Sequence, residues 1–452
     1  MNPNIFKAYD IRGVYPEELN EESAYKIGLA FIEFTNAKNV LVGEDARVSS
    51  PSLRDSLVKG LRAGGANVFL AGKLTTPMFY FGVAEGKDYD AGIMVTASHN
   101  PGKYNGFKMV YGDALPIGEG SGMETIKDLV LNGNLKPKKD GELYNVEIKK
   151  DYINKILSLL SAESIKPLKI IVDTGNGMEG VILPDLLKKL PQLDATNLFI
   201  DIDMSFPNHE ANPLKEETLK ELKKEVIKQS ADLGVAFDGD ADRIGFVDEL
   251  GQTVRADYIL ALILENLYKK YPNSVALYDL RCSKIVPETI KKLGGTPKMT
   301  RVGHAFIKKE LRAVNGIVAG ELSSHFYFKD FYGVECSELV MLYILQLLSE
   351  KNTPFSKLVS LLKKYYQSGE INFEVKEKTK KIAELKEKYS NGASDFSELD
   401  GIRIEFVDKN EFWWFNVRAS NTEPLLRLNI EAGDKKLLEE KLNELSDFIL
   451  DN

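Results

Sequence analysis

The feature that most constrains the fold is an alternation of strand-like apolar runs with helical patterns, repeated along most of the chain. In the first cycle, strands are predicted at 39–43, 67–70, 93–95 and 107–110, and a helix at 53–63. Strands that alternate with helices predict a mostly parallel sheet with helices on its faces. We therefore expect an α/β fold.

The alternation restarts twice. The second cycle predicts strands at 168–173, 198–201, 233–237 and 244–247, and helices at 151–160 and 213–229. The third predicts helices at 256–269 and 305–313, and strands at 275–279 and 317–320. One strand of each cycle runs into an aspartate, Asp45, Asp173 or Asp279, which hints at a repeated unit.

The last part of the chain has a different organisation. Strand-like segments at 371–375, 402–406, 413–417 and 426–430 are grouped, with a Lys/Glu-rich helix among them and a helix at 435–450 at the end. Grouped strands with few helices predict a smaller α+β domain.

Composition narrows the class of protein. With 452 residues, 43% hydrophobic and 28% charged, the chain can form several cores. A net charge of −8 argues against nucleic-acid binding, and no segment has the length and apolar character of a membrane span. The only cysteines, Cys282 and Cys336, have no metal-type spacing. We expect a cytoplasmic protein in a reducing compartment.

One loop carries a candidate nucleophile. Val95 to Pro101 follows the buried run 91–95, at the carboxyl end of a strand, where α/β proteins place chemistry. It contains Ser98, which we predict to carry a phosphoryl group. The alternative is a solvated turn serine. No Gly-x-Ser-x-Gly pattern surrounds Ser98, so a serine hydrolase is disfavoured.

A second loop is acidic. Asp238, Asp240 and Asp242 alternate along it, and carboxylates so placed can turn toward one hard cation such as Mg²⁺. Without a cation, three neighbouring negative charges would repel one another. An EF-hand is excluded because Arg243 stands where that loop needs glycine. The alternative is a solvated acidic turn.

Two further loops suit a phosphorylated sugar. Arg418, Ser420, Thr422 and Arg427, with turn backbone N–H groups, form a candidate phosphate-binding site, against the alternative of a surface turn. In the other loop, Glu321 and Ser323 can bind sugar hydroxyls, and His325 is a candidate general acid or base, against the alternative of a structural histidine. Two further cationic residues are candidates. Lys108 follows the Ser98 loop closely in sequence, after Asn105, and Arg12 lies in a non-helical segment before Gly13.

In chain order these stretches read FKAYDIRG, TASHNP, DGDADR, GELSSH and RASNTEP. Together they resemble the α-D-phosphohexomutase superfamily, in its phosphomannomutase/phosphoglucomutase branch, from Phe6 to Arg427. The resemblance implies four domains around a central cleft, three similar α/β/α units and a smaller α+β unit. We expect them at 1–147, 148–250, 251–366 and 367–452.

The resemblance also implies roles for individual residues. Ser98 would be the phosphoserine and would hold Mg²⁺ together with Asp238, Asp240 and Asp242. Lys108 and Arg243 would stabilise the transferring phosphoryl group, and Arg12, His325 and His304 would assist proton transfer. The residues implied to bind substrate are Tyr9, Arg281, His304, Glu321, Ser323, Arg418, Ser420, Asn421, Thr422 and Arg427.

The activity implied is conversion of hexose 1-phosphate to hexose 6-phosphate, with mannose or glucose as the sugar, through a hexose 1,6-bisphosphate. We expect sugar phosphates as partners, and a monomer or homodimer. A phosphoglucosamine mutase is disfavoured because Leu322 and Asn421 depart from that branch. The alternative from another class is a non-catalytic sugar-phosphate binder. Within the family, Arg281 replaces a frequent lysine, and the segment 335–337 replaces an Asp-rich one.

Overall fold

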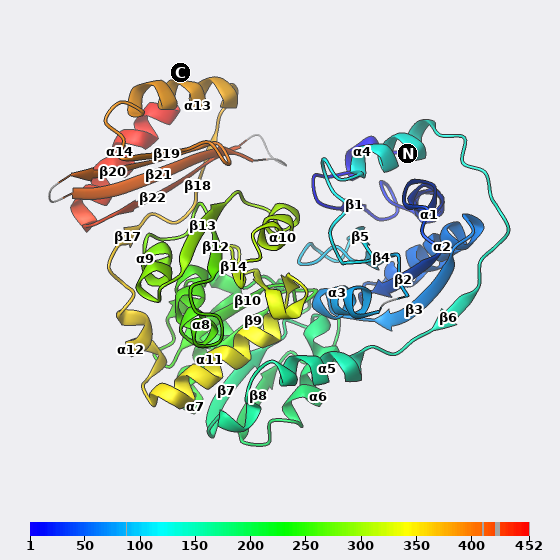
Figure 1. The fold of residues 1–452 in the computed structure, drawn as a ribbon, viewed down its shortest axis with the longest axis horizontal. Helices are drawn as coiled ribbons and strands as arrows, with labels where there is room; N and C mark the ends of the chain where they lie inside the picture. The colour runs from blue at the N-terminus through cyan, green and yellow to red at the C-terminus, as the bar shows by residue number, and fades with distance from the viewer. Residues whose placement is uncertain (87, 409–410, 421–424, 452) are drawn as a thin grey trace.

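A computed structural model describes residues 1–86, 88–408, 411–420 and 425–451. Its described strands form four sheets that follow one another along the chain (Figure 1). We call the parts built on these sheets units 1 to 4. No helix among the described residues combines the length and apolar character needed to cross a bilayer.

Unit 1 has the sheet order β1-β5-β4-β2-β3-β6. Its strands are β1 (Ile11–Val14), β2 (Asn39–Glu44), β3 (Asn67–Lys73), β4 (Ala91–Val95), β5 (Tyr104–Tyr111) and β6 (Leu143–Asn145). Its helices are α1 (Glu21–Thr35), α2 (Ser50–Ala63), α3 (Thr76–Glu85) and α4 (Met123–Asn132). Helix α1 begins at a capping box between Asn20 and Ser23 and ends at Asn36 in the left-handed conformation.

Units 2 and 3 have five-stranded sheets, in the orders β11-β10-β9-β7-β8 and β13-β12-β14-β15-β16. Unit 2 contains α5 (Lys149–Ser158), β7 (Leu168–Asp173), α6 (Leu183–Leu187), β8 (Leu193–Leu198), α7 (Lys220–Gln229), β9 (Leu233–Phe237), β10 (Ile244–Asp248) and β11 (Thr253–Val254). Unit 3 contains α8 (Ala256–Lys270), β12 (Val275–Asp279), α9 (Ile285–Lys292), β13 (Thr296–Thr300), α10 (His304–Ala313), β14 (Val318–Gly320), β15 (Phe326–Phe328), β16 (Val334–Glu335), α11 (Ser337–Lys351) and α12 (Phe355–Ser360).

Unit 4 is a sheet covered by two helices, α13 and α14, at the opposite end of the molecule from unit 1 (Figure 1). Its elements are β17 (Tyr366–Gln367), β18 (Ile371–Glu374), α13 (Lys378–Tyr389), β19 (Asp395–Ser397), β20 (Ile402–Asp408), β21 (Glu411–Ala419), β22 (Leu425–Ala432) and α14 (Lys435–Leu450). Short 3₁₀ turns lie at Pro3–Ile5, Ala162–Ser164, Met178–Val181, Glu216–Leu219 and Lys329–Phe331.

The first three sheets are mostly parallel, as the sequence predicts, with one reversed strand in each. In each, one strand turns back antiparallel to its predecessor, β5 on β4, β10 on β9 and β15 on β14. The connections, at 96–103, 238–243 and 321–325, are too short for the crossover that parallel strands need. These three connections carry the Ser98, Asp238 and Glu321 motifs.

The three predicted strands that run into Asp45, Asp173 and Asp279 occupy equivalent positions in their sheets. Strands β2, β7 and β12 occupy the same place in their sheets, each beside the strand that enters a motif loop. At the end of each, an aspartate Oδ1 accepts the backbone N–H two residues later: Asp45 from Arg47 at 3.0 Å, Asp173 from Gly175 at 2.8 Å, and Asp279 from Arg281 at 2.7 Å. The same carboxylate turn therefore ends the equivalent strand in all three units.

Two predicted elements of unit 2 were misplaced. The strand expected at 198–201 is β8, which ends at Leu198, because Phe199 adopts a left-handed φ of 53° and leaves the sheet. The helix expected from Pro213 begins only at Lys220, after a 3₁₀ turn. There the Asn212 side chain accepts the Leu214 N–H, a local bond that competes with helix formation.

Units 1, 2 and 3 share a core centred on α11. This helix has apolar residues on all its faces and buries nearly all of them, among them Leu339, Met341 and Ile344. A helix that is apolar all round must lie inside the protein. The shared core joins α3 of unit 1 to the sheets of units 2 and 3, which fixes their motif loops relative to one another.

A pair of buried acids lies in this shared region. Glu179 of unit 2 and Glu338 at the start of α11 are both wholly buried, and Tyr152 of α5 donates its hydroxyl to Glu338 Oε2 at 2.8 Å. Burial raises the pKa of Glu338 to about 7 and that of Glu179 well above its ordinary value. At least one of the two carboxyls is therefore protonated near neutral pH.

This pair predicts a stability that falls as the pH rises. A carboxyl whose pKa is higher in the folded than in the unfolded protein stabilises the fold at low pH, and the effect is lost as the pH rises through about 7. We expect the calorimetric unfolding temperature to fall by about 2 °C or more between pH 6 and pH 8. The unfolding temperature of the double variant Glu179→Gln/Glu338→Gln should fall by less over the same pH range. An equal fall in that variant and in an exposed control, Glu350→Gln, would contradict this assignment.

Candidate active site

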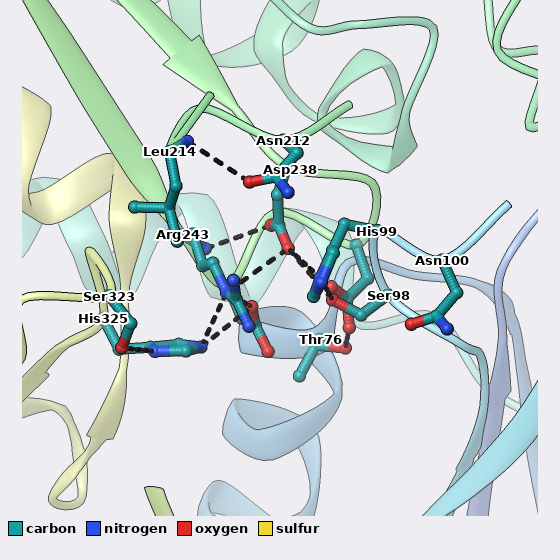
Figure 2. Close-up of polar contacts among 12 residues, drawn as sticks. Thr76, Ser98, His99, Asn100, Asn212, Leu214, Asp238, Arg243, Ser323 and His325 are labelled. Carbon is teal, nitrogen blue, oxygen red and sulfur yellow. Dashed lines mark hydrogen bonds and ion pairs between the residues drawn. The ribbon is translucent and has the colours of Figure 1, made fainter. Parts of the chain in front are cut away.

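Ser98 lies in the connection between β4 and β5, with a left-handed φ of 52° that is uncommon outside glycine. Its backbone N–H is donated to the Thr96 hydroxyl at 3.0 Å. Its side-chain hydroxyl donates to Asp238 Oδ2 at 3.0 Å, and His99 Nδ1 lies 3.2 Å from Ser98 Oγ (Figure 2). The hydroxyl of unit 1 therefore points at the acidic loop of unit 2.

Arg47 holds the Ser98 loop in this shape. Its side chain is fully buried and its Nε donates to Asp45 Oδ2 at 3.0 Å. Its two terminal nitrogens donate to four backbone carbonyls of the loop: Ser98 at 2.7 Å, Asn100 at 2.7 Å, Pro101 at 2.9 Å and Tyr104 at 3.1 Å. A planar guanidinium can serve this many acceptors at once, which a lysine cannot. The stretch from Gly43 to Arg47 also agrees with the family pattern, but the sequence prediction assigned Arg47 no role.

The acidic loop between β9 and β10 brings three carboxylates together. Asp238, Asp240 and Asp242 are buried, and one oxygen of each lies within 4.8 Å of the others. Gly239 permits the two loops to meet, since a Cβ there would stand 2.5 Å from the Ser98 carbonyl oxygen. Burial and the two neighbouring aspartates raise the pKa of Asp238 well above its ordinary range.

These residues fit a divalent cation. The donors are carboxylate oxygens, which Mg²⁺ prefers, and the Ser98 oxygen is beside them. Asp240 Oδ1 is buried and has no hydrogen-bond partner among the described residues. An unpartnered buried carboxylate oxygen is costly unless a proton or a cation satisfies it.

Two residues of unit 1 partly balance the acidic loop. Lys108 on β5 donates to Asp240 Oδ2 at 2.7 Å and to Asp242 Oδ2 at 2.6 Å, and Thr76 donates to Asp240 Oδ2 at 2.6 Å. Burial alone would lower the pKa of Lys108, but the two aspartates hold it well above its ordinary value. Lys108 is thus a fixed cation on the aspartate triad that the Ser98 hydroxyl also contacts. Sequence reasoning missed Thr76, whose only signal was its place at the start of a helix.

His325 of unit 3 completes this side of the site. Asp242 Oδ1 lies 3.3 Å from its Nε2, and Glu321 Oε2 lies 3.2 Å from its Nδ1. Burial alone would lower the pKa of His325, but the two carboxylates raise it to about 9. Arg243 Nε also lies 3.2 Å from Nε2 (Figure 2). The two carboxylates outweigh that guanidinium, so the ring is an imidazolium.

Glu321 and Ser323, the predicted sugar-hydroxyl ligands, both contact the ring of His325. Ser323 Oγ lies 3.0 Å from His325 Nδ1. Glu321 is buried, accepts the Tyr327 hydroxyl at 2.7 Å and accepts the Gly303 N–H at 3.0 Å. Its carboxylate therefore also joins the His325 loop to the turn that precedes His304.

Arg12, Tyr9 and His304 also line the site. Arg12 donates to Asn100 Oδ1 at 2.6 Å and forms an ion pair with Asp10. The Tyr9 ring meets the His304 ring edge-on, with centroids 5.4 Å apart, so units 1 and 3 touch here. Burial lowers the pKa of His304 well below its ordinary value, and the ring is neutral.

A cleft of about 1080 Å³ lies between these groups, large enough for a phosphorylated sugar. Units 1, 2 and 3 all contribute to its lining, with Tyr9, Arg12, Ser98, Lys108, Asp242, Arg243, His304 and His325. No described residue of unit 4 lines it. The structure thus brings together the predicted residues of the first three units except Arg281. Glu321 and Ser323 contact His325 but do not line the cleft.

The predicted phosphate-binding residues of unit 4 form a separate group. Arg418 on β21 and Arg427 on β22 each form an ion pair with Glu370, at 3.1 and 3.0 Å, and Arg427 donates to Ser420 Oγ at 3.4 Å. Arg281 belongs to this group and not to the cleft lining: it pairs with Asp279 at 2.7 Å and approaches Glu370 at 3.6 Å. Asn421 and Thr422 lie outside the described residues.

Comparison with known proteins finds four family models that match successive parts of the chain. Family models of phosphoglucomutase/phosphomannomutase match in order: α/β/α domain I at 3–136, domain II at 150–251, domain III at 255–365, and the C-terminal domain at 370–447. The phosphomannomutase of Methanocaldococcus jannaschii is 42% identical over 98% of this chain and 97% of its own length. The predicted fold class is confirmed.

Solved structures agree. A phosphoglucomutase/phosphomannomutase family protein of Burkholderia thailandensis is 32% identical, with a TM-score of 0.89 over 99% of this chain and 97% of its own. Aspergillus fumigatus N-acetylphosphoglucosamine mutase shares the fold, with TM-scores of 0.61 and 0.64 at 14% and 16% identity over 99% of this chain and 95% and 96% of its own. It was solved with glucose 1,6-bisphosphate, and with GlcNAc-6P and magnesium.

The acidic loop predicts a measurable cation site. We expect Mn²⁺, followed by electron paramagnetic resonance, to bind the wild-type protein and to bind the Asp240→Asn variant at least about tenfold more weakly, because one of three carboxylate donors is lost. The control Asp194→Asn, on exposed β8, should bind Mn²⁺ as the wild type does. Unchanged Mn²⁺ affinity in Asp240→Asn would show that the loop is only a structural turn.

Proposed function

Because the chain belongs to the phosphoglucomutase/phosphomannomutase family, we propose that it interconverts hexose 1-phosphate and hexose 6-phosphate, of mannose or glucose, through a phosphoserine at Ser98. One observation carries the proposal: the Ser98 hydroxyl lies 3.0 Å from a carboxylate of the buried aspartate triad, beside the fixed ammonium of Lys108. A binding protein has no need of a nucleophile there.

The aspartate triad would hold the magnesium ion on which the family depends, with an oxygen of phosphorylated Ser98 as a further ligand. When bound, this ion supplies positive charge to the transferring phosphoryl group. Lys108 adds a second positive charge, and Arg243 a third from the side of His325. Phosphoryl transfer depends mainly on such positioning and charge, which is why these cations are fixed before substrate arrives.

The two histidines His325 and His304 would transfer protons. His325 is an imidazolium and can give a proton to an oxygen of the sugar phosphate, whereas neutral His304 can accept one. Arg12 cannot be deprotonated at neutral pH, so its contribution is its charge and its bond to Asn100 in the Ser98 loop.

Arg418, Ser420 and Arg427, with Asn421 and Thr422, would bind the phosphate that does not react, and Glu321 and Ser323 the sugar hydroxyls. Arg281 and Tyr9 would contact the substrate as it bridges units 3 and 4. Since the described phosphate-binding residues lie outside the cleft lining, unit 4 would move toward the cleft when substrate binds.

The intermediate would be hexose 1,6-bisphosphate. It would form when O6 of hexose 1-phosphate accepts the phosphoryl group of phosphorylated Ser98, which leaves the free Ser98 hydroxyl. The bisphosphate would then turn over in the cleft and return the phosphoryl group at C1 to Ser98, which releases hexose 6-phosphate. A remote relative of the same fold was solved with glucose 1,6-bisphosphate, which supports a bisphosphate as the activator. A cytoplasmic location and a monomer or homodimer stay predictions from the sequence.

Turnover of Ser98→Ala tests the proposal. In a coupled assay with Mg²⁺ and hexose 1,6-bisphosphate, we expect the wild type to convert mannose or glucose 1-phosphate and to prefer either over glucosamine 1-phosphate. Ser98→Ala should lose at least about a thousandfold in kcat, because no covalent acceptor remains. The control Ser161→Ala, at an exposed site, should keep full activity.

Two outcomes would contradict the proposal. Full turnover by a folded Ser98→Ala protein would exclude the phosphoserine route. Binding of sugar phosphates by the wild type without any turnover would identify a non-catalytic binder.

A further inference from the structure

Three positively charged side chains converge on one carboxylate at the junction of units 3 and 4. Glu370 Oε2 lies 3.1 Å from a terminal nitrogen of Arg418 and 3.6 Å from one of Arg281, and Glu370 Oε1 lies 3.0 Å from one of Arg427. Arg418 and Arg427 come from paired strands of unit 4, and Arg281 follows β12 of unit 3. Glu370 directly precedes β18.

The cluster has the charge and the donors that suit a phosphate group. Asp279 pairs with Arg281, and Glu370 pairs with both Arg418 and Arg427. Arg418 is buried, and its Nε has no hydrogen-bond partner among the described residues. Guanidinium groups bind phosphate through paired N–H donors. The cluster therefore offers three guanidinium groups and at least one unused buried donor.

Glu370 is placed where it can exchange with an incoming anion. It follows Gly369, whose φ of 70° and open surroundings mark a turn between β17 and β18. About a quarter of its side chain is exposed, whereas Arg418 and Arg281 are more than nine-tenths buried. Burial would raise the pKa of Glu370, but the three arginines hold it below its ordinary value. Glu370 is thus an anion that solvent and ligands can reach.

Without a counter-charge, these buried arginines would be costly to keep close together. Carboxylate and phosphate oxygens compete for the same N–H donors, so a bound phosphate and Glu370 cannot both bind them fully. A bisphosphate that turns over must also release its distal phosphate in each cycle. A neighbouring carboxylate that recaptures the arginines lowers the cost of that release.

We propose that Glu370 is a positioning residue that holds Arg418, Arg427 and Arg281 in the free enzyme, yields them to the distal phosphate of the substrate, and recaptures them when that phosphate leaves. The proposal deepens the proposed function and rests on it for the identity of the ligand. Glu370 therefore weakens phosphate binding in the ground state and speeds turnover.

The test is Glu370→Gln, which removes the charge and keeps the shape. By isothermal titration calorimetry with inorganic phosphate, we expect this variant to bind at least about fivefold more tightly than the wild type. In the hexose 1-phosphate assay, KM and kcat should both fall, because release becomes slower. The matched control Glu374→Gln, exposed on β18 and equal in net charge, should differ from the wild type in neither measurement.

A triple variant locates the effect. In an Arg418→Gln/Arg427→Gln background, Glu370→Gln should change the phosphate affinity by less than about twofold, since the proposed competition needs these two arginines. An equal gain in that background would assign the effect to another phosphate site and overturn the proposal. If Glu370→Gln does not fold, Glu370→Asp, which is too short to reach all three arginines, should tighten phosphate binding in the same direction.

Two further results for Glu370→Gln would overturn the proposal. Weaker or unchanged phosphate binding in Glu370→Gln would mean that Glu370 only supports the arginines, which overturns the proposal. Tighter binding with unchanged kcat would overturn the role in release. The phosphate titration needs no turnover, so failure of this proposal is distinguishable from absence of mutase activity in the wild type.

Discussion

The arrangement of the cleft depends on the buried ion pair between Asp45 and Arg47. Ser98 has a left-handed backbone conformation that a serine adopts only under constraint, and Arg47 supplies that constraint through four backbone carbonyls of the loop. Asp45 in turn fixes Arg47 at the end of β2. Because β2 lies at the centre of the first sheet, the nucleophile is tied to the most rigid part of unit 1.

Other buried charges of the protein are also held by an oppositely charged side chain. Two concentrations of one sign are balanced by a side chain from a distant segment: the aspartate triad by Lys108, and the arginines by Glu370. Buried Lys308 is paired too, with its Nζ 2.6 Å from Glu335 Oε2. In the first two cases a ligand of the proposed reaction carries the balancing charge as well. The free protein is therefore balanced by its own residues, and the proposed metal ion and phosphate add to or replace them.

Much of this organisation was readable from the sequence, because apolar strands and their motif loops are local patterns. The strands at 168–173, 233–237 and 275–279 have the predicted bounds. Ser98 and the aspartates of the acidic loop do meet. Thr76, Arg47, Tyr327 and Glu370 escaped because their partners are distant in sequence or are backbone atoms, which no motif encodes. The reversed direction of β5, β10 and β15 was not predicted, because connection length, not apolar pattern, sets strand direction.

The central claim is that Ser98 carries the phosphoryl group, and mass spectrometry of one peptide tests it most directly. The tryptic peptide from Asp88 to Lys103 contains Ser98 as its only serine. After incubation with hexose 1,6-bisphosphate and Mg²⁺, this peptide should gain the mass of one phosphoryl group at Ser98 and lose it when excess hexose 1-phosphate is added. A peptide that never gains this mass, gains it at another residue, or keeps it in the presence of hexose 1-phosphate would contradict the account.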